Sequence, residues 1–178
     1  MEMTVGAWGA LIMGFFGAVF AALTMYWQWH VSSLLLVVPF VVFAPIALAA
    51  AHVILLPGDG IKPSARAERV IMWSSIGEGV GLFLVSNIAI NLHRPDLLLP
   101  AMALVVGLHF LPIAFAAPFK PFYLLGAALI LFAIAGFILR APVGGEVAGF
   151  IAAVGLWTAA AIAVRRDWRA KQPVARSV

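Results

Sequence analysis

The sequence contains no cysteine among its 178 residues, and it contains very little charge. The first absence excludes disulfides, thiolate metal sites, iron–sulfur clusters and thiol redox catalysis. Charged residues make up only 10% of the chain, whereas hydrophobic residues make up 65%. A soluble domain carries roughly 25% charged residues because its surface faces water. This chain has too little charge to cover a water-soluble core, so its surplus apolar surface indicates that lipid is its solvent.

The motifs of several large protein classes are also missing. There is no phosphate-binding loop, no Gly-x-Ser-x-Gly elbow, no dinucleotide fingerprint and no three-ligand zinc pattern. We therefore assign no catalytic residue and no metal ligand. The net charge of +4 does not indicate nucleic acid binding. Membrane topology explains the positive charges, because they gather in predicted loops and in the C-terminal segment.

Long apolar stretches define the architecture. Residues 3–58 contain no Asp, Glu, Lys or Arg, and because a membrane-spanning helix needs about 20 mostly apolar residues, this stretch holds two spans. Later segments rich in Gly, Pro and charge are loops. The pattern predicts an all-α bundle of six transmembrane helices in one domain, residues 1–164, followed by a cytoplasmic basic tail, residues 165–178. The predicted helices are residues 5–27, 34–56, 70–92, 97–117, 122–139 and 147–164.

Lys and Arg are divided unevenly between the two ends of this predicted bundle. Nine of them fall on the side that carries both termini, and only Arg94 and Arg140 fall on the other. Cytoplasmic segments of membrane proteins carry the Lys and Arg excess. We therefore expect both termini in the cytoplasm, a location in the cytoplasmic (inner) membrane, and membrane lipid as a partner.

Small residues recur every four positions along the first predicted helix. They are Gly6, Ala10, Gly14, Ala18 and Ala22. This spacing lets helix backbones approach closely in lipid. The face either packs within the same chain, which we favour, or docks this helix on a partner subunit or a second copy.

Glu78 is the one acidic residue well inside a predicted helix. It lies about 12 Å from the cytoplasmic end of the helix at 70–92. A charged carboxylate at this depth costs roughly 2.5–3.5 kcal/mol on insertion scales, so we expect it to face the bundle interior, to be protonated, or both. It is either a neutral or hydrogen-bonded structural residue, or a proton or cation carrier or substrate anchor.

His109 lies at a matching depth of about 13 Å in the helix at 97–117. A short turn joins the two helices, so they are antiparallel neighbours and Glu78 and His109 can meet. A carboxylate beside an imidazole can hold a shared proton and form a relay. Ser75 lies close enough to Glu78 around the helix to share its cavity. A single histidine can also be a satisfied core residue, so both interpretations of His109 stay open.

Prolines and further polar residues supply secondary candidates. Pro45 and Pro112 each free a backbone carbonyl inside a helix, and broken helices often line transporter cavities, so we expect a cavity between the second, third and fourth helices. Asn87 and Asn91 lie on the opposite face from Glu78, where interhelical hydrogen bonding is their expected role. His52 is a further secondary candidate.

Haem is the cofactor alternative that the histidines leave open. It needs two axial histidines that face each other, and the pairs would be His30 with His93 or His52 with His109. No spacing motif accompanies either pair, so we expect no cofactor.

The segments WSSIGEGVG at 73–81 and VGLHFLP at 106–112 resemble small bacterial six-helix integral membrane proteins of unassigned function. The resemblance covers about the third to fifth helices, and it implies that Glu78 and His109 occur together without implying an activity. A looser similarity links the chain to the substrate-binding subunits of energy-coupling-factor vitamin transporters. That similarity rests on size, helix number and the small-residue face of the first helix, and no vitamin-binding motif accompanies it.

Three functional hypotheses follow. The first is binding or transport of a small lipophilic or weakly charged solute, with Glu78 and His109 binding it or exchanging a proton. The second is a membrane enzyme that acts on a lipid or quinone, with the same two residues as general acid and base. The third is a structural or partner-binding membrane subunit without a site. We favour the first, and hence a non-enzymatic role.

Overall fold

The computed structural model describes residues 5–57, 63–117, 119–139 and 141–172. These residues form helices and connecting turns, and no strand occurs among them. The elements are α1 (Val5–Trp29), η1 (Leu34–Val37), α2 (Val38–Leu55), α3 (Ala65–Asn91), η2 (Pro95–Leu97), α4 (Leu98–Ala116), α5 (Lys120–Ile138) and α6 (Val143–Lys171). Six helical segments are long and apolar enough to cross a membrane. The predicted all-helical architecture with six such helices is therefore confirmed, and it has the character of a multi-pass membrane protein.

Two helices extend more than two residues beyond their predicted bounds. α3 begins at Ala65, before the expected start at residue 70, because the Ser64 hydroxyl accepts a hydrogen bond from the Ala67 N–H at 3.2 Å and caps the first turn. α6 runs from Val143 to Lys171, so residues 165–171, which were expected to belong to the tail, are helical. In both helices the additional turns carry charge, so a hydropathy pattern assigns them to loops.

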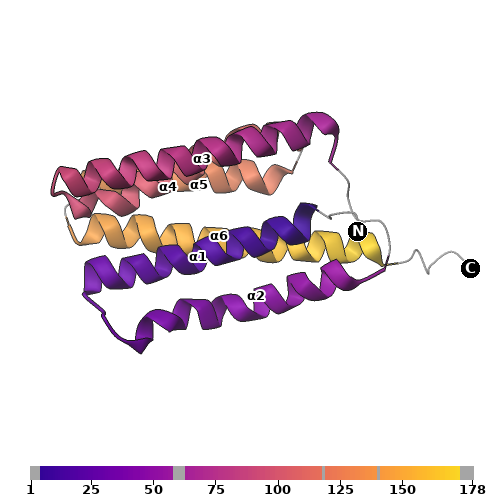
Figure 1. Ribbon diagram of the computed structural model, residues 1–178, viewed down its shortest axis with the longest axis horizontal. Coiled ribbons are helices and arrows are strands. Elements are labelled where there is room, and N and C mark those ends of the chain that lie inside the picture. Colours follow the sequence, from indigo (N-terminus) through magenta and orange to yellow (C-terminus); the bar gives the residue numbers. More distant parts are fainter. Residues whose placement is uncertain (1–4, 58–62, 118, 140, 173–178) are drawn as a thin grey trace, which may run out of the picture.

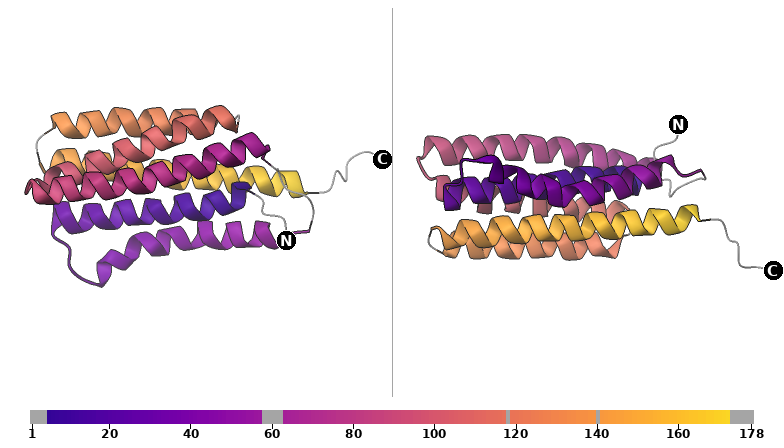
Figure 2. Two further views of the ribbon diagram at one scale, coloured as in Figure 1. Left: turned by 45° about the horizontal axis from the view of Figure 1, so that its top comes forward. Right: turned by 90° about the horizontal axis from the view of Figure 1, so that it is seen from below.

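The helices form two groups of three (Figures 1 and 2). In one group α1 packs against both α6 and α2, and in the other α4 packs against both α5 and α3. The groups meet where α6 contacts α5 and α4. α1 and α3, by contrast, make no more than marginal contact with each other. The outer helices α2 and α3 consequently bury few residues, whereas α1, α4 and α6 bury many.

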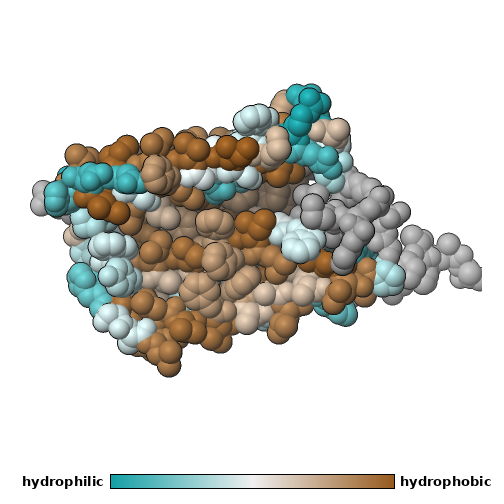
Figure 3. Space-filling view, in the orientation of Figure 1, coloured by the Kyte–Doolittle hydropathy of each residue, from teal (hydrophilic) through white to brown (hydrophobic). Residues whose placement is uncertain are grey.

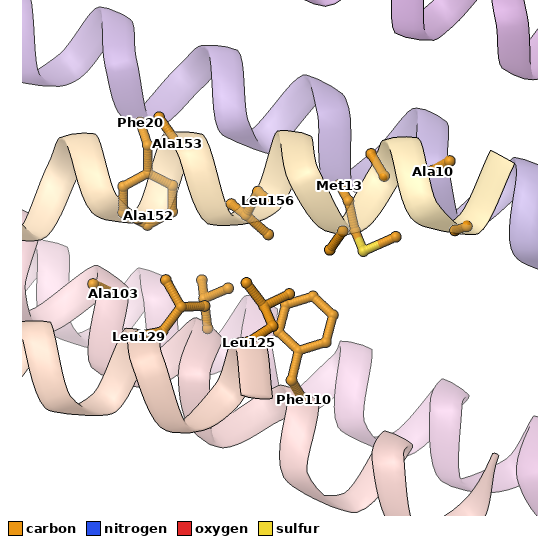
Figure 4. Close-up of a cluster of buried hydrophobic side chains, with 14 of the residues drawn as sticks. Ala10, Met13, Phe20, Ala103, Phe110, Leu125, Leu129, Ala152, Ala153 and Leu156 are labelled. Carbon is orange, nitrogen blue, oxygen red and sulfur yellow. The ribbon is translucent and has the colours of Figure 1, made fainter. Parts of the chain in front are cut away.

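The core lies between α1 and α6 on one side and α4 and α5 on the other (Figure 4). Phe20 of α1 and Leu156 of α6 face Leu129 of α5, and all three are almost completely buried. Alanines of α1 and α6 fill the interface between those two helices, so their backbones approach closely.

The small-residue face of α1 is used inside the chain. Ala10 and Ala18 are fully buried, and Gly17 lies against Trp157 of α6, whose indole N–H donates to the Gly14 carbonyl at 3.0 Å. Packing within the chain therefore accounts for this pattern. Docking of a partner subunit or second copy through α1 stays a prediction.

The last turns of α6 hold the ends of two other helices. The buried Asp167 carboxylate accepts a hydrogen bond from the Ala7 N–H at 2.9 Å, where α1 begins. The Lys171 ammonium donates to the carbonyls of Val53, Ile54 and Leu56, at 2.8, 3.2 and 3.0 Å, where α2 ends. The first N–H groups and last carbonyls of a helix lack intrahelical partners, and the helix dipole favours an anion at the start and a cation at the end. α6 therefore places an anion, Asp167, at the start of α1 and a cation, Lys171, at the end of α2, and each charge is the favourable one for its helix end.

Candidate functional site

Glu78 of α3 and His109 of α4 are brought together by the antiparallel packing of these two helices. Oε2 of Glu78 lies 3.6 Å from Nε2 of His109, and the two side chains are only 15% and 9% exposed. This separation is an ion-pair contact and is slightly long for a direct hydrogen bond. The matched depth that the sequence predicts is therefore present in the fold.

The pair lines a cavity of about 150 Å³. Ser75 lines the same cavity one helical turn before Glu78, as expected. Apolar side chains make up most of the remaining wall. They come from α1 (Ile12, Met13, Phe16), α3 (Ile71), α4 (Val106, Phe110, Ile113), the α4–α5 connection (Ala117), α5 (Phe122) and α6 (Leu156), and Gly6 and Gly9 of α1 and Arg166 of α6 also line the cavity.

The helices around this cavity differ from the expected set. The expected cavity between the second, third and fourth helices is wrong for this site, because α1 takes the position assigned to α2. α2 packs on α1 and α6, on the side of α1 away from α3 (Figure 1). Pro45 of α2 consequently lines a separate groove against α6.

The cavity lies between α1 and α3. Both helices contribute wall residues, yet they make no more than marginal contact with each other. Figure 3 views the face on which α3 and α1 run side by side, and its surface is largely hydrophobic. Ile12, at the α1 wall, is 58% exposed on the outside of the bundle. The gap between α1 and α3 is therefore the side from which an apolar molecule could approach the pair.

Arg166 of α6 is a wall residue that the sequence did not single out. Its guanidinium stacks over the Phe119 ring at 4.5 Å and bonds to Oδ1 of Asp167 at 3.2 Å. It reaches the cavity only because α6 continues as a helix past residue 164. The hydropathy pattern that placed this residue in a tail contains no signal for that continuation.

The second nitrogen of His109 is an unusual feature of the site. Among the described residues, Nδ1 is buried and makes no hydrogen bond. Buried polar atoms are almost always paired with protein, water or ligand. An imidazole whose Nε2 faces a carboxylate and whose Nδ1 is unpaired has capacity for one further partner.

The hydrogen-bonding character of Nδ1 in His109 depends on which group carries the proton at Nε2. When Glu78 is ionised, Nε2–H can face the carboxylate and Nδ1 is a hydrogen-bond acceptor. When Glu78 carries the proton, it can face a bare Nε2, and Nδ1–H becomes a donor. Closer approach of the two groups would let the imidazole pass a proton between Glu78 and a group on its other side, which is what a proton relay requires.

The secondary candidates lie elsewhere. Asn87 donates from Nδ2 to the Phe83 carbonyl of its own helix at 2.7 Å, and within the described residues it makes no hydrogen bond to another helix; its expected interhelical role stays a prediction. Asn91 is exposed at the end of α3. His52 lines the groove between α2 and α6, away from the cavity of His109.

His30 and His93 have a local structural role. Both are exposed and adopt a φ of 54°, directly after α1 and one residue beyond the α3 C-cap. Left-handed residues of this kind commonly terminate helices. No group of three His, Asp or Glu side chains suited to a metal ion occurs in the described parts of the chain.

Comparison of the chain with protein-family models, with curated proteins and with solved structures gave no match. The fold and the cavity therefore define only a class, which is a six-helix protein with membrane-spanning character and a buried carboxylate–imidazole pair. The function has to be argued from the chemistry of that pair.

Proposed function

We propose that this chain is an integral protein of the cytoplasmic (inner) membrane, with both termini in the cytoplasm, that binds or transports a small lipophilic or weakly charged solute. One observation carries the proposal: Glu78 and His109 lie 3.6 Å apart, mostly buried, at the wall of one cavity. An ionised carboxylate in an apolar bundle is energetically costly unless a neighbouring group compensates its charge. Here it faces an imidazole and a space that a second molecule can occupy.

The size and lining of the cavity limit the solute. A dry apolar cavity of about 150 Å³ accommodates a benzene-sized molecule, and this cavity has a comparable volume. Apart from Ser75, Glu78, His109 and Arg166, its lining is apolar. The bound part of the solute is therefore about one ring in size, with one group that hydrogen-bonds to His109 or Glu78. Entry between α1 and α3 suits a molecule that partitions into lipid.

Filling the cavity is a direct test of this proposal. Gly9 lines the cavity, and a Cβ atom added there meets nothing within 4 Å. Gly9→Leu should therefore fill the space without disturbing the helix contacts. Gly77→Leu is the matched control, because Gly77 of α3 also has open space around it but is not part of the cavity wall.

The measurement is mass spectrometry of the small molecules that copurify with each protein from native membranes. The proposal predicts a stoichiometric small molecule on the wild type and on Gly77→Leu, and its loss from Gly9→Leu. Glu78→Gln and His109→Leu should also weaken its retention. Equal small-molecule content in the wild type and Gly9→Leu would show that the cavity is not a binding site.

The proton relay requires a second measurement. The infrared carboxyl absorption of Glu78, identified by its absence in Glu78→Gln, reports ionisation directly. Groups that interact strongly titrate as a pair, so replacing His109 by Leu should change the midpoint of the Glu78 titration. An unchanged midpoint would show that the two groups do not interact and would remove the relay from the proposal.

A membrane enzyme that acts on a lipid or quinone is the second candidate, favoured by the apolar lining and the separation of α1 from α3. Glu78 and His109 would be its general acid and base. The copurified molecule decides between the two functions. The enzymatic function is correct if purified protein in liposomes converts this molecule to a product, and if Glu78→Gln stops the conversion while the molecule stays bound. Binding without conversion supports the solute-binding function.

A further inference from the structure

A second concave surface lies between α2 and α6, apart from the Glu78–His109 cavity. It has a volume of about 400 Å³, within the range of roughly 300–1,000 Å³ that is typical of ligand sites. Its floor is formed by the buried Val53 and Val164, and its walls by residues of each helix that are exposed, except for the half-buried Ile46. The wall residues are Pro45, Ile46, Ala49 and His52 on α2, and Ala161, Arg165 and Trp168 on α6.

The groove is apolar along its length and polar at one end. Pro45 and Ala161 mark its apolar part, whereas His52, Arg165 and Trp168 lie near the ends of their helices, where both helices approach the same end of the bundle (Figure 1). Arg165 is exposed, and the exposed Arg169 follows it one helical turn later. An amphipathic molecule with an anionic end matches this distribution.

Lys171 strengthens the positive potential at this end. Its ammonium bonds to the carbonyls that end α2, beside the floor residue Val53. Those carbonyls would otherwise repel an anion, because the end of a helix carries a partial negative charge. With Lys171 in place, the end of the groove presents arginine and imidazole to an incoming anion.

We propose that this groove binds one anionic phospholipid, with an acyl chain along Pro45, Ala49 and Ala161 and the phosphate at Arg165. The arginine fork matches phosphate geometry, and tryptophan prefers the headgroup level of a bilayer, where Trp168 would lie. Basic pockets between transmembrane helices are known sites for anionic headgroups. This inference requires that the chain spans a membrane, but it does not depend on the proposed role of Glu78 and His109.

A phospholipid fits better than a soluble anion. A soluble anion needs only the polar end, whereas most wall residues of this groove are apolar. α2 also buries few residues and packs less extensively against α6 than against α1. A bound acyl chain would fill the space between the two helices and hold α2 in place.

The headgroup is tested by counting bound lipids. Protein in detergent is mixed with equal amounts of phosphatidylglycerol and phosphatidylcholine with identical acyl chains, and native mass spectrometry measures each lipid retained. The wild type should prefer phosphatidylglycerol. The electrostatic attraction between one basic residue and an anionic headgroup is strong enough that Arg165→Gln should reduce the preference for phosphatidylglycerol roughly fivefold. Arg94→Gln, which removes an exposed arginine at the opposite end of the bundle, should leave the preference unchanged.

The acyl chain is tested by blocking the groove. Ala49→Phe fills the groove with a side chain from its α2 wall. Ala51→Phe places the same side chain on an exposed position of α2 outside the groove. Ala49→Phe should remove the retained phosphatidylglycerol, and Ala51→Phe should keep it. The proposal is overturned if the wild type shows no headgroup preference, if Arg94→Gln and Arg165→Gln act equally, or if the two alanine variants retain the same amount of lipid.

Discussion

Lys171 provides the most informative stability prediction, because one side chain joins α6 to the end of α2. Lys171 is only 9% exposed, and its ammonium donates three hydrogen bonds, at 2.8, 3.0 and 3.2 Å, to carbonyls at the end of α2. Lys171→Met keeps much of the apolar stem but removes all three bonds. The carbonyls of Val53, Ile54 and Leu56 then lose their donor at a helix end.

The expected loss follows from the character of these bonds. A hydrogen bond to a charged group contributes about 1.5–3 kcal/mol, but the three bonds share one ammonium and water can reach part of this helix end. The favourable charge at the helix C-terminus adds about 0.3–1 kcal/mol. We therefore expect Lys171→Met to lower the free energy of unfolding by about 3 kcal/mol. In a chain of this length that corresponds to a fall in melting temperature of about 6–12 °C.

Arg169→Met is the matched control. It removes the same charge from the same turn of α6, but Arg169 is exposed, and such surface substitutions change stability by about 0.5 kcal/mol or less. Thermal unfolding in detergent gives the global effect, and hydrogen exchange in the last turn of α2 gives the local one. Equal melting temperatures for the two variants would refute the conclusion that Lys171 fixes the end of α2.

Three further predictions concern packing and capping. A methyl group at Gly149 would collide with Oγ1 of Thr24, so Gly149→Ala should destabilise the bundle by about 1–3 kcal/mol; Gly79→Ala, with open space around it, should not destabilise it, as thermal unfolding will show. Asp167→Ala leaves the buried Ala7 N–H without its acceptor and should cost about 1–3 kcal/mol, with faster hydrogen exchange in the first turn of α1; exchange there that matches the wild type would contradict this contact. Ser64→Ala should cost about 1 kcal/mol and fray α3 only up to about Ala67, and a loss of protection spread along the whole helix would contradict a local cap.

The hydropathy pattern and the spacing of a few polar residues predicted much of this fold. Long uncharged stretches predicted the six helices, and the turn between α3 and α4 predicted that Glu78 would meet His109, which lies 3.6 Å away. These predictions succeed because the rise per residue of a helix and the antiparallel pairing of neighbouring helices together fix the depth of each residue in the bundle. They do not fix the angular order of helices around the bundle, so α2 was expected at the cavity wall that α1 forms.

The contributions of α6 escaped prediction for a different reason. Arg166, Asp167 and Lys171 look like a solvated tail in a hydropathy pattern, because charge there usually marks the end of a span. Asp167 and Lys171 bond to backbone groups of α1 and α2, more than a hundred positions earlier in the chain, and Arg166 contacts the Phe119 ring and Asp167. Only the folded arrangement reveals that these charges complete two other helices, and that one of them borders the cavity.

The pairing of α1 with α6 has a consequence for how the protein is made. α1 finds its main packing partner in α6, and the carboxylate that caps its first turn belongs to Asp167, 160 positions after Ala7. α3, α4 and α5 can pair with their sequence neighbours as they emerge, because their contacts are local. α1 cannot bury its alanine face against α6 until α6 has been synthesised, so this contact forms only after α2 to α5 have emerged from the ribosome.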